Sequence, residues 1–413
     1  MSELSYLEKL LDGVEVEWKT LKDVCDFKNG FAFKSSLFKE TGLPIVRITN
    51  IDGFNVDLDE VKYFSLNDYK EDLSSFEVSM GNILIAMSGA TTGKVGIYKK
   101  GIKCYLNQRV GKFIPKENIL NNNYLYHFLL LNTETIYILA GGGAQPNLSS
   151  NALMSKLLIP IPCPGNPEKS LAIQSEIVRI LDKFTELTAE LTAELSMRKK
   201  QYNYYRDQLL SFDEEQEKPI YQEKLLDGVE VEWLPLSDLA RIRNGKDHKS
   251  LSEGEFPVYG SGGIIRYVDT YAYNKPSVLI PRKGSLGNLF FIDVPFWTVD
   301  TIFYTEIDEA QIRPKYLYYF LTTVGLGEMN QAGGVPSQTQ SVLNKLKIPI
   351  PCPDNPEKSL AIQSEIVRIL DKFDTLTNSI TEGLPREIEL RQKQYEYYRD
   401  LLFSFPKPET ISN

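Results

Sequence analysis

Side chains that suit contacts with a nucleic acid occur in both halves of this 413-residue sequence. Arg, Lys, Asn and Gln can hydrogen-bond to the edges of bases, whereas Ser, Thr and Lys suit phosphate groups. The first half contains Lys34, Arg47, Ser88, Thr91, Thr92, Lys94, Lys99, Asn107, Gln108, Arg109 and Gln145. The second half contains Arg241, Arg243, Lys246, His248, Arg282, Lys283, Ser285 and Gln338. As a group they favour DNA binding, although each residue taken alone suits a structural role equally well.

A glycine-rich stretch, GATTGKV at residues 89–95, is the segment most similar to a nucleotide-binding loop. A phosphate-binding P-loop has four residues between its first glycine and the Gly-Lys pair, and Ser or Thr follows the lysine. Here three residues intervene and Val95 follows the lysine. The spacing therefore argues against a nucleotide site, and we expect this loop to place its hydroxyl groups and Lys94 near a phosphate backbone.

Residues for covalent or metal-dependent catalysis are scarce. Of the two histidines, His127 lies in an apolar stretch and is expected in the core, whereas His248 lies in a basic segment. The four cysteines are isolated from one another, so neither a zinc ribbon nor a disulfide framework is indicated. No convincing glycine fingerprint for a dinucleotide or for S-adenosylmethionine opens a helix after a strand. We therefore expect a chain that is not an enzyme by itself and that binds no cofactor or metal.

The net charge of -9 at first argues against a nucleic-acid partner, but the charge is unevenly distributed. Residues 20–160 contain 15 Lys and Arg against 13 Asp and Glu, and residues 235–349 contain 12 against 11. Between Glu77 and Glu117 every charged residue is basic, namely Lys94, Lys99, Lys100, Lys103, Arg109, Lys112 and Lys116. Such a basic stripe on an acidic protein suits phosphate binding, although it would also suit an ordinary solvated surface.

Two segments occur twice and divide the chain into two halves. EKLLDGVEVEW is found unchanged at Glu8–Trp18 and at Glu223–Trp233, and residues 159–184 recur at residues 348–373 with one difference in 26 positions. The inserts between these repeats show little evident identity. Because one framework surrounds two different inserts, we expect the framework to meet the same partner surface twice while the inserts meet two different targets.

The repeats set the predicted domain boundaries. These are an N-terminal repeat segment (1–19), a first insert domain (20–158), a central framework with a long spacer helix (159–216), a second N-terminal repeat segment (217–234), a second insert domain (235–347) and a distal framework with a second spacer helix (348–413). Strand-like runs and turn-rich connections in the inserts, with a helical patch in the first, predict one mixed α and β fold for both. The predicted fold class is α+β with an internal pseudo-twofold repeat.

A long helix is predicted over residues 168–212, where apolar residues recur at spacings of three and four without Pro or Gly. At 1.5 Å per residue it would extend roughly 65 Å, which is too long for one small core, so it requires a partner helix. The second copy supplies that partner, and the two helices are expected to pair as an antiparallel coiled coil. A break is expected near Gly383, which can end one helix, before Pro385, which can begin the next.

Within the first helix, TAELTAEL at residues 188–195 repeats a four-residue unit. One unit adds about 6 Å of helix, whereas one base pair occupies about 3.4 Å of DNA. Adding or removing a unit should therefore move whatever lies at the helix ends by about one or two base pairs.

A membrane location is not indicated. No apolar run reaches the roughly 18 residues that span a bilayer, and the N-terminus has neither a basic start nor an apolar signal core. We therefore expect a cytoplasmic protein without membrane contact.

Together these features resemble a known family closely. The two unlike inserts, the near-identical repeats, the TAEL units and the stretch GNILIAMSGATTGKVGIY at residues 81–98 look like the DNA-specificity subunit of a type I restriction-modification enzyme. The framework resembles that of the IC subgroup. The resemblance covers the whole chain.

The resemblance implies a division of labour between subunits. In this family each insert is a target-recognition domain that reads one half of a split site in double-stranded DNA, and the paired helices separate the two readers. Two modification (methyltransferase) subunits dock on the repeats, bind S-adenosylmethionine and methylate adenine. Two restriction subunits add translocation and cleavage, which depend on ATP and Mg. The chain itself is expected to hold none of these cofactors.

Two other classes of protein remain as alternatives. A coiled-coil scaffold that joins protein partners would explain the helices and the acidic framework, but neither the basic stripe nor the difference between the inserts. A nucleotide-using enzyme would need the glycine-rich loop to be a true P-loop. DNA binding that is sequence-selective and sensitive to salt would distinguish a DNA-specificity subunit from both the scaffold and the nucleotide-using enzyme.

Overall fold

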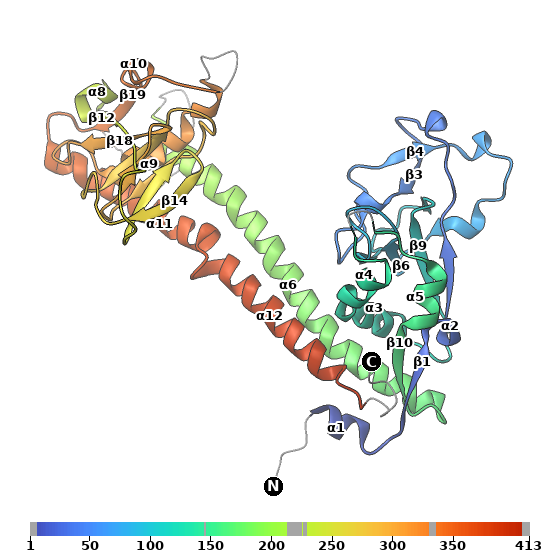
Figure 1. Ribbon diagram of the computed structural model, residues 1–413. Helices are drawn as coiled ribbons and strands as arrows, with labels where there is room; N and C mark the ends of the chain where they lie inside the picture. The colour runs from blue at the N-terminus through green and yellow to red at the C-terminus, as the bar shows by residue number, and fades with distance from the viewer. Residues whose placement is uncertain (1–5, 144–145, 213–224, 226–228, 330–335, 407–413) are drawn as a thin grey trace, which may run out of the picture. The chain divides into compact units, whose positions relative to one another are not determined.

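The computed structural model describes residues 6–143, 146–212, 225, 229–329 and 336–406. The chain forms two compact units (Figure 1), unit 1 of Met1–Glu190 with Glu389–Asn413 and unit 2 of Leu191–Ile388. Each unit contains one insert and one copy of each framework repeat. The C-terminal segment therefore belongs to unit 1, although it follows unit 2 in sequence.

A two-stranded antiparallel sheet holds the two ends of each insert together. In unit 1, β1 (Val16–Thr20) pairs with β10 (Leu158–Pro162). In unit 2, β11 (Val231–Pro235) pairs with β19 (Lys347–Pro351). The duplicated segments of the sequence thus lie side by side in each unit, which explains why they are duplicated together.

The first insert contains two four-stranded sheets, with the strand orders β2-β9-β6-β7 and β4-β3-β8-β5. The strands are β2 (Cys25–Asn29), β3 (Leu43–Val46), β4 (Lys62–Phe64), β5 (Glu77–Val78), β6 (Ile83–Ala86), β7 (Val95–Ile97), β8 (Cys104–Leu106) and β9 (Val110–Pro115). All four residues of β6 are buried, because both faces of its sheet are covered, and its sequence ILIA is accordingly apolar without alternation.

The second insert repeats this arrangement, with the strand orders β12-β18-β15-β16 and β14-β13-β17. The strands are β12 (Ala240–Asn244), β13 (Phe256–Gly260), β14 (Gly263–Val268), β15 (Ser277–Pro281), β16 (Phe290–Ile292), β17 (Trp297–Thr298) and β18 (Ile302–Ile307). Like β6, the central strand β15 is buried along its whole length. The two inserts therefore share one mixed α and β fold, as the sequence predicts.

One helix of each insert joins the insert to the framework. These are α3 (Asn122–Leu131) and α9 (Pro314–Thr323), which share the residues YLY near their starts. The hydroxyl of Tyr124 in α3 donates to the carbonyl of Pro160 in β10 at 2.9 Å, and Tyr316 in α9 donates to Pro349 in β19 at the same distance. The shared tyrosine thus makes the same contact with the repeated proline in both units.

The remaining short helices connect the sheets and the framework. The α-helices are α1 (Tyr6–Leu11), α2 (Leu21–Val24), α4 (Thr133–Leu139), α5 (Ser150–Lys156), α8 (Leu236–Leu239) and α10 (Gln340–Leu343). The 3₁₀ helices are η1 (Ser35–Leu37), η2 (Ile48–Asn50), η3 (Leu66–Asp68), η4 (Ser74–Phe76) and η5 (Leu326–Glu328).

The predicted long helix is confirmed as α6 (Pro167–Leu210), which has 44 residues. Its counterpart is broken into α11 (Pro356–Asn378) and α12 (Gly383–Leu402), as expected from Gly383 and Pro385. Gly383 has φ 79, and a Cβ there would lie 2.4 Å from the carbonyl oxygen of Thr375, so only glycine fits this turn. Within the described residues, no helix combines the length and the apolar character needed to cross a bilayer.

Each unit completes its core with the end of a long helix from the other sequence repeat. In unit 1 the ring of Phe184 in α6 stacks on Tyr398 in α12, with centroids 5.1 Å apart. In unit 2 the equivalent Phe373 in α11 stacks on Tyr205 in α6, with centroids 5.4 Å apart. Leu402 and Phe403 then enter the core of unit 1, while Leu209 and Leu210 enter that of unit 2. The repeated aromatic residues therefore make equivalent ring contacts in both units.

Candidate nucleic-acid interface

In unit 1, four loops meet at one end of the sheets, and we call them loop cluster 1. They are residues 47–48 after β3, 88–93 between β6 and β7, 107–109 between β8 and β9, and 146–148 before α5. Four backbone hydrogen bonds join them. The N–H of Met87 donates to the carbonyl of Arg109 at 2.9 Å, and the N–H of Asn107 donates to that of Val46 at 3.0 Å. The N–H of Gly89 donates to the carbonyl of Pro146 at 3.3 Å, and the N–H of Leu148 donates to that of Met87 at 2.7 Å.

Unit 2 has a matching loop cluster 2, made of residues 260–261, 282–288, 299–301 and 336–338. The N–H of Arg282 donates to the carbonyl of Thr301 at 2.8 Å, and the N–H of Val299 donates to that of Tyr259 at 3.0 Å. The N–H of Gly284 donates to the carbonyl of Pro336 at 2.8 Å, and the N–H of Gln338 donates to that of Arg282 at 3.0 Å. These four bonds match those of loop cluster 1 one for one. The two clusters are therefore one backbone arrangement that carries different side chains.

The most exposed part of loop cluster 1 is the turn at residues 107–109. Gln108 and Arg109 are exposed and Asn107 is partly buried. Lys94, which follows the glycine-rich loop, is also exposed. An arginine or an amide on a fixed turn can form paired hydrogen bonds to a base edge, and a nearby lysine can contact a phosphate. The structure thus places three of the residues that the sequence singles out, Asn107, Gln108 and Arg109, on one turn of loop cluster 1.

Ser88 and Arg47 lie deeper in loop cluster 1. Both are partly buried, and Arg47 donates from Nη2 to the carbonyl of Glu60 at 3.4 Å. The Ser88 hydroxyl and the Arg47 Nε are buried without a hydrogen-bond partner among the described residues. Buried polar atoms are normally satisfied, so these two groups are exceptions within loop cluster 1.

The threonines of the glycine-rich loop hold loop cluster 1 together. The Thr92 side chain is buried, and its hydroxyl donates to the carbonyl of Gly89 at 2.6 Å, with the carbonyl of Pro146 also within reach at 3.1 Å. The Thr91 hydroxyl donates to the carbonyl of Ile48 at 3.2 Å. A hydroxyl used in this way is not available to a phosphate, so we correct our expectation for Thr92 and assign it a positioning role.

The basic stripe expected from the sequence does not form one free surface, because acidic residues from elsewhere in the insert pair with it. Lys100 Nζ lies 2.8 Å from Asp57, and Lys103 Nζ lies 2.5 Å from Glu77. The Lys112 and Lys116 ammonium groups donate to the backbone carbonyls of Glu77 and Asp23 at 2.6 and 2.9 Å respectively. Burial lowers the pKa of Lys112.

Three other predicted residues lie outside loop cluster 1 or outside the described residues. Lys99 is exposed but follows β7, whose end pairs with the start of β6, so it lies at the opposite end of the sheet. Lys34 is exposed, and its backbone N–H donates to the Tyr69 hydroxyl at 3.0 Å within the other sheet. Gln145 lies outside the described residues. We therefore exclude Lys99 from loop cluster 1.

Loop cluster 2 contains four of the residues predicted for the second insert, Arg282, Lys283, Ser285 and Gln338, and Lys246 lies beside it. The Arg282 guanidinium lies over the ring of Phe303, 5.7 Å from its centroid, and Ser285 is exposed. Lys283 Nζ lies 3.4 Å from Asp300. Lys246 is exposed, and its N–H donates to the carbonyl of Thr298 at 2.8 Å, next to the turn at residues 299–301.

The remaining predicted residues of the second insert lie outside loop cluster 2, except Gln338, which is buried within it. Arg241 and Arg243 lie on the edge strand β12, where Arg243 pairs with Glu306 at 2.9 Å. His248 is partly buried, and its Nδ1 has no partner among the described residues. Gln338 is buried and donates from Nε2 to the carbonyl of Pro281 at 2.5 Å. Gln338, like Thr92, therefore positions loops, which corrects our expectation of a DNA contact.

Sequence reasoning missed the turn residues Asp300 and Thr301. They occupy the positions that Gln108 and Arg109 hold in loop cluster 1. A search for basic and amide side chains passes over an aspartate, and no obvious sequence identity aligns the two turns. The buried strands β9 and β18 that follow each turn are the feature that could have aligned them.

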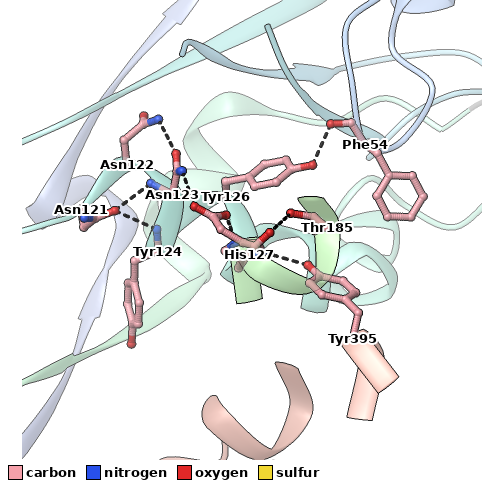
Figure 2. Close-up of polar contacts among 10 residues, drawn as sticks. Phe54, Asn121, Asn122, Asn123, Tyr124, Tyr126, His127, Thr185 and Tyr395 are labelled. Carbon is pink, nitrogen blue, oxygen red and sulfur yellow. Dashed lines mark hydrogen bonds and ion pairs between the residues drawn. The ribbon is translucent and has the colours of Figure 1, made fainter. Parts of the chain in front are cut away.

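The expectation that His127 lies in the core is confirmed, since its side chain is fully buried. Figure 2 shows His127 next to Tyr395, whose hydroxyl oxygen lies 2.9 Å from Nδ1. On the other side, Nε2 lies 2.8 Å from Asp182 in α6. Asn123 also donates to Asp182, at 3.0 Å. His127 thus links α3 of the insert to both framework helices, α6 and α12, and has a structural role.

The carboxylate of Asp182 stabilises the folded state. Burial acts to raise its pKa, but hydrogen bonds from His127 and Asn123 outweigh burial, and the pKa falls below 3.8. A depressed pKa means that this contribution is fully present above the unfolded-state value and is lost as the pH falls through the folded-state value. In unit 2 the equivalent Asp371 accepts from Tyr319 at 2.6 Å and pairs with Lys315 at 2.8 Å. The repeated aspartate therefore anchors both inserts.

Within the described ranges, no group of three or more His, Cys, Asp or Glu side chains is placed to hold a metal ion. The matched loop clusters instead offer recognition chemistry on two copies of one scaffold.

Comparison with known proteins agrees with this reading. A family model described as the type I restriction modification DNA specificity domain matches residues 13–197 and 228–390. Because these two matches cover most of the chain, the protein belongs to the family of type I restriction-modification specificity subunits.

Curated relatives extend along the full chain. The specificity subunit of the type I restriction enzymes EcoR124I and EcoR124II of Escherichia coli is 40% identical, with 100% of both chains covered. The EcoprrI specificity subunit of Escherichia coli is 35% identical over 92% of this chain and 93% of its own length. A crystal structure of the S subunit from M. genitalium has a TM-score of 0.60 at 20% identity and covers 96% of this chain and 98% of its own. That likeness supports the fold alone.

Proposed function

We propose that this chain selects DNA sequence for a type I restriction-modification complex, with residues 20–158 and 235–347 serving as two target-recognition domains. The observation that carries the proposal is the pair of loop clusters, in which matching hydrogen bonds hold different side chains. One scaffold with two sets of side chains suits the reading of two different half-sites. A scaffold that only joins protein partners would not need this difference.

We further propose that the framework helices pair antiparallel as a coiled coil around a pseudo-twofold axis and set the distance between half-sites. The equivalent stacks of Phe184 on Tyr398 and Phe373 on Tyr205 support this arrangement, because each joins the same two positions of the repeat. The TAELTAEL segment at residues 188–195 lies in the uninterrupted helix α6, where it would set the length of the spacer.

The partners follow from the repeated framework. We propose that two modification subunits dock on the two repeats, and that two restriction subunits complete the complex in the cytoplasm. S-adenosylmethionine, ATP and Mg would then bind to those partners, while this chain contributes recognition. A structural neighbour with a TM-score of 0.53, at 14% identity and covering 94% of this chain and 97% of its own, comes from work on complex assembly and conformational transition of the type I system.

Arginine substitutions in the loop clusters test the two-reader proposal. Arg109→Ala and Arg282→Ala are each expected to weaken binding to the correct site by about 1–3 kcal/mol, if each arginine contacts a guanine edge. Binding of the complex with its methyltransferase partner would be measured against duplexes that carry single base-pair changes in either half-site. Each variant should lose discrimination in a different half-site.

Lys116→Ala is the matched control, because Lys116 follows β9 whereas Arg109 precedes it. The control should lower the affinity for all duplexes slightly and leave base preference unchanged. Unchanged base preference in both arginine variants would reject base contacts by these residues. If the unsubstituted complex itself shows no base preference, the protein-scaffold alternative would take precedence.

A further inference from the structure

The turn at residues 299–301 in unit 2 takes the place of the turn at residues 107–109 in unit 1. Besides the matching hydrogen bonds, a glycine packs against each turn in the same way. A Cβ on Gly30 would lie 2.0 Å from the carbonyl oxygen of Asn107, and a Cβ on Gly245 would lie 2.0 Å from that of Val299. The backbones of the two turns are therefore presented alike.

The side chains on these turns differ in charge. Gln108 and Arg109 of loop cluster 1 correspond to Asp300 and Thr301 of loop cluster 2. The Thr301 hydroxyl accepts a hydrogen bond from the backbone N–H of Ser261 at 3.3 Å, so it is engaged within the loop cluster. The Asp300 side chain is 67% exposed. Asp300 is thus the outermost polar group of the second turn.

A carboxylate at this place is unsuited to the DNA backbone, because phosphates repel it. On the base edges, the groups that attract a carboxylate are exocyclic amino groups, which in the major groove are cytosine N4 and adenine N6. Lys283, 3.4 Å from Asp300, can hold the carboxylate in place and offset its repulsion from nearby phosphates. An aspartate supported in this way can therefore read a base without contacting the backbone.

We propose that Asp300 determines specificity in the second recognition domain by accepting a hydrogen bond from an exocyclic amino group, on cytosine or on adenine. This inference rests on the proposed function, because it requires that residues 235–347 read a half-site. Lys283 then acts as a positioning residue that orients the carboxylate. The first domain carries Gln108 and Arg109 on its turn, whose side chains suit adenine and guanine instead of cytosine.

The test compares Asp300→Ala, which removes the acceptor oxygens, with the unsubstituted chain, each in complex with its methyltransferase partner. Binding is measured against duplexes with every single base-pair change in each half-site. Discrimination at one base pair of the second half-site is expected to fall roughly tenfold to a hundredfold, because a good base contact gives about that preference. Preferences in the first half-site should remain unchanged.

Asp293→Ala is a charge-matched control. Asp293 follows β16, whose Ile292 pairs with Ser277 at the start of β15, so it lies at the opposite end of the sheet from loop cluster 2. This control should retain every base preference. A duplex in which the critical cytosine or adenine lacks its amino group then identifies the base, since it should weaken binding of the unsubstituted chain and not of Asp300→Ala.

Two outcomes would overturn the inference and can be told apart from failure of the proposed function. If Asp300→Ala changes the affinity for all duplexes equally, Asp300 acts only through its charge. If the variant keeps every base preference, Asp300 reads no base. In both cases the unsubstituted complex would still distinguish two half-sites, whereas the absence of any such preference would reject the proposed function itself.

Discussion

Replacing Gly30 with alanine is expected to abolish recognition by the first domain while leaving the second domain intact. The Cβ of the new residue would lie 2.0 Å from the carbonyl oxygen and 2.4 Å from the carbonyl carbon of Asn107. Both atoms belong to the backbone, so no rotation of a side chain can relieve the clash. The turn that carries Gln108 and Arg109 must therefore move, at an expected cost of about 4 kcal/mol or more.

Gly245→Ala should have the same effect on the second domain, because its Cβ would lie 2.0 Å from the carbonyl oxygen of Val299. Gly101→Ala is the control, since no heavy atom outside its chain neighbours lies within 4 Å of the added Cβ. Methylation of DNA libraries randomised in one half-site at a time would measure the effect. If Gly30→Ala preserved the base preference in both half-sites, the turn at residues 107–109 would not be the reader.

Substitution of His127 is expected to weaken unit 1 selectively. The side chain is fully buried and joins α3 to both Asp182 and Tyr395. His127→Ala would leave a cavity and remove a partner from a buried carboxylate, which together should lower the free energy of unfolding by about 3–5 kcal/mol. Hydrogen exchange in the full chain should show faster exchange in α3, with α9 of unit 2 unchanged.

His127→Tyr is the informative companion, because unit 2 has Tyr319 at the same position of the shared helix and bonds it to Asp371 at 2.6 Å. Tyrosine should therefore restore much of the lost protection. Equal exchange in α3 for His127→Ala and the unsubstituted chain would show that this network does not anchor the insert.

The parts of the fold that sequence could predict are those with long, regular patterns. Helix α6 was predictable because no Pro or Gly interrupts its apolar spacing, and the break before α12 because Gly383 and Pro385 lie together. The common fold of the inserts was harder to establish, because the YLY residues of α3 and α9 are embedded in unlike sequence. Their role becomes clear only when Tyr124 and Tyr316 are seen to bond to the repeated prolines.

The candidate site could be predicted only in part, because charge along the chain does not report pairing in space. Lys100 and Lys103 appeared free in the sequence, yet Asp57 and Glu77 neutralise them across neighbouring segments. Similarly, Thr92 and Gln338 have suitable side chains for DNA but are buried between loops. Asp300 was missed for the opposite reason, because its chemistry is significant only at the position that Gln108 holds in the other domain.

The central claim is that two readers are held apart by a helical spacer, and adenine methylation in cells tests it most directly. The chain would be co-expressed with its methyltransferase partner, and methylated sites would be mapped for the parent and for a variant that lacks Thr192–Leu195. The account predicts a split motif whose two halves stay the same in the variant while the gap between them shortens by about one or two base pairs. A motif without two halves, or a deletion that changes the bases read and leaves their spacing intact, would contradict it.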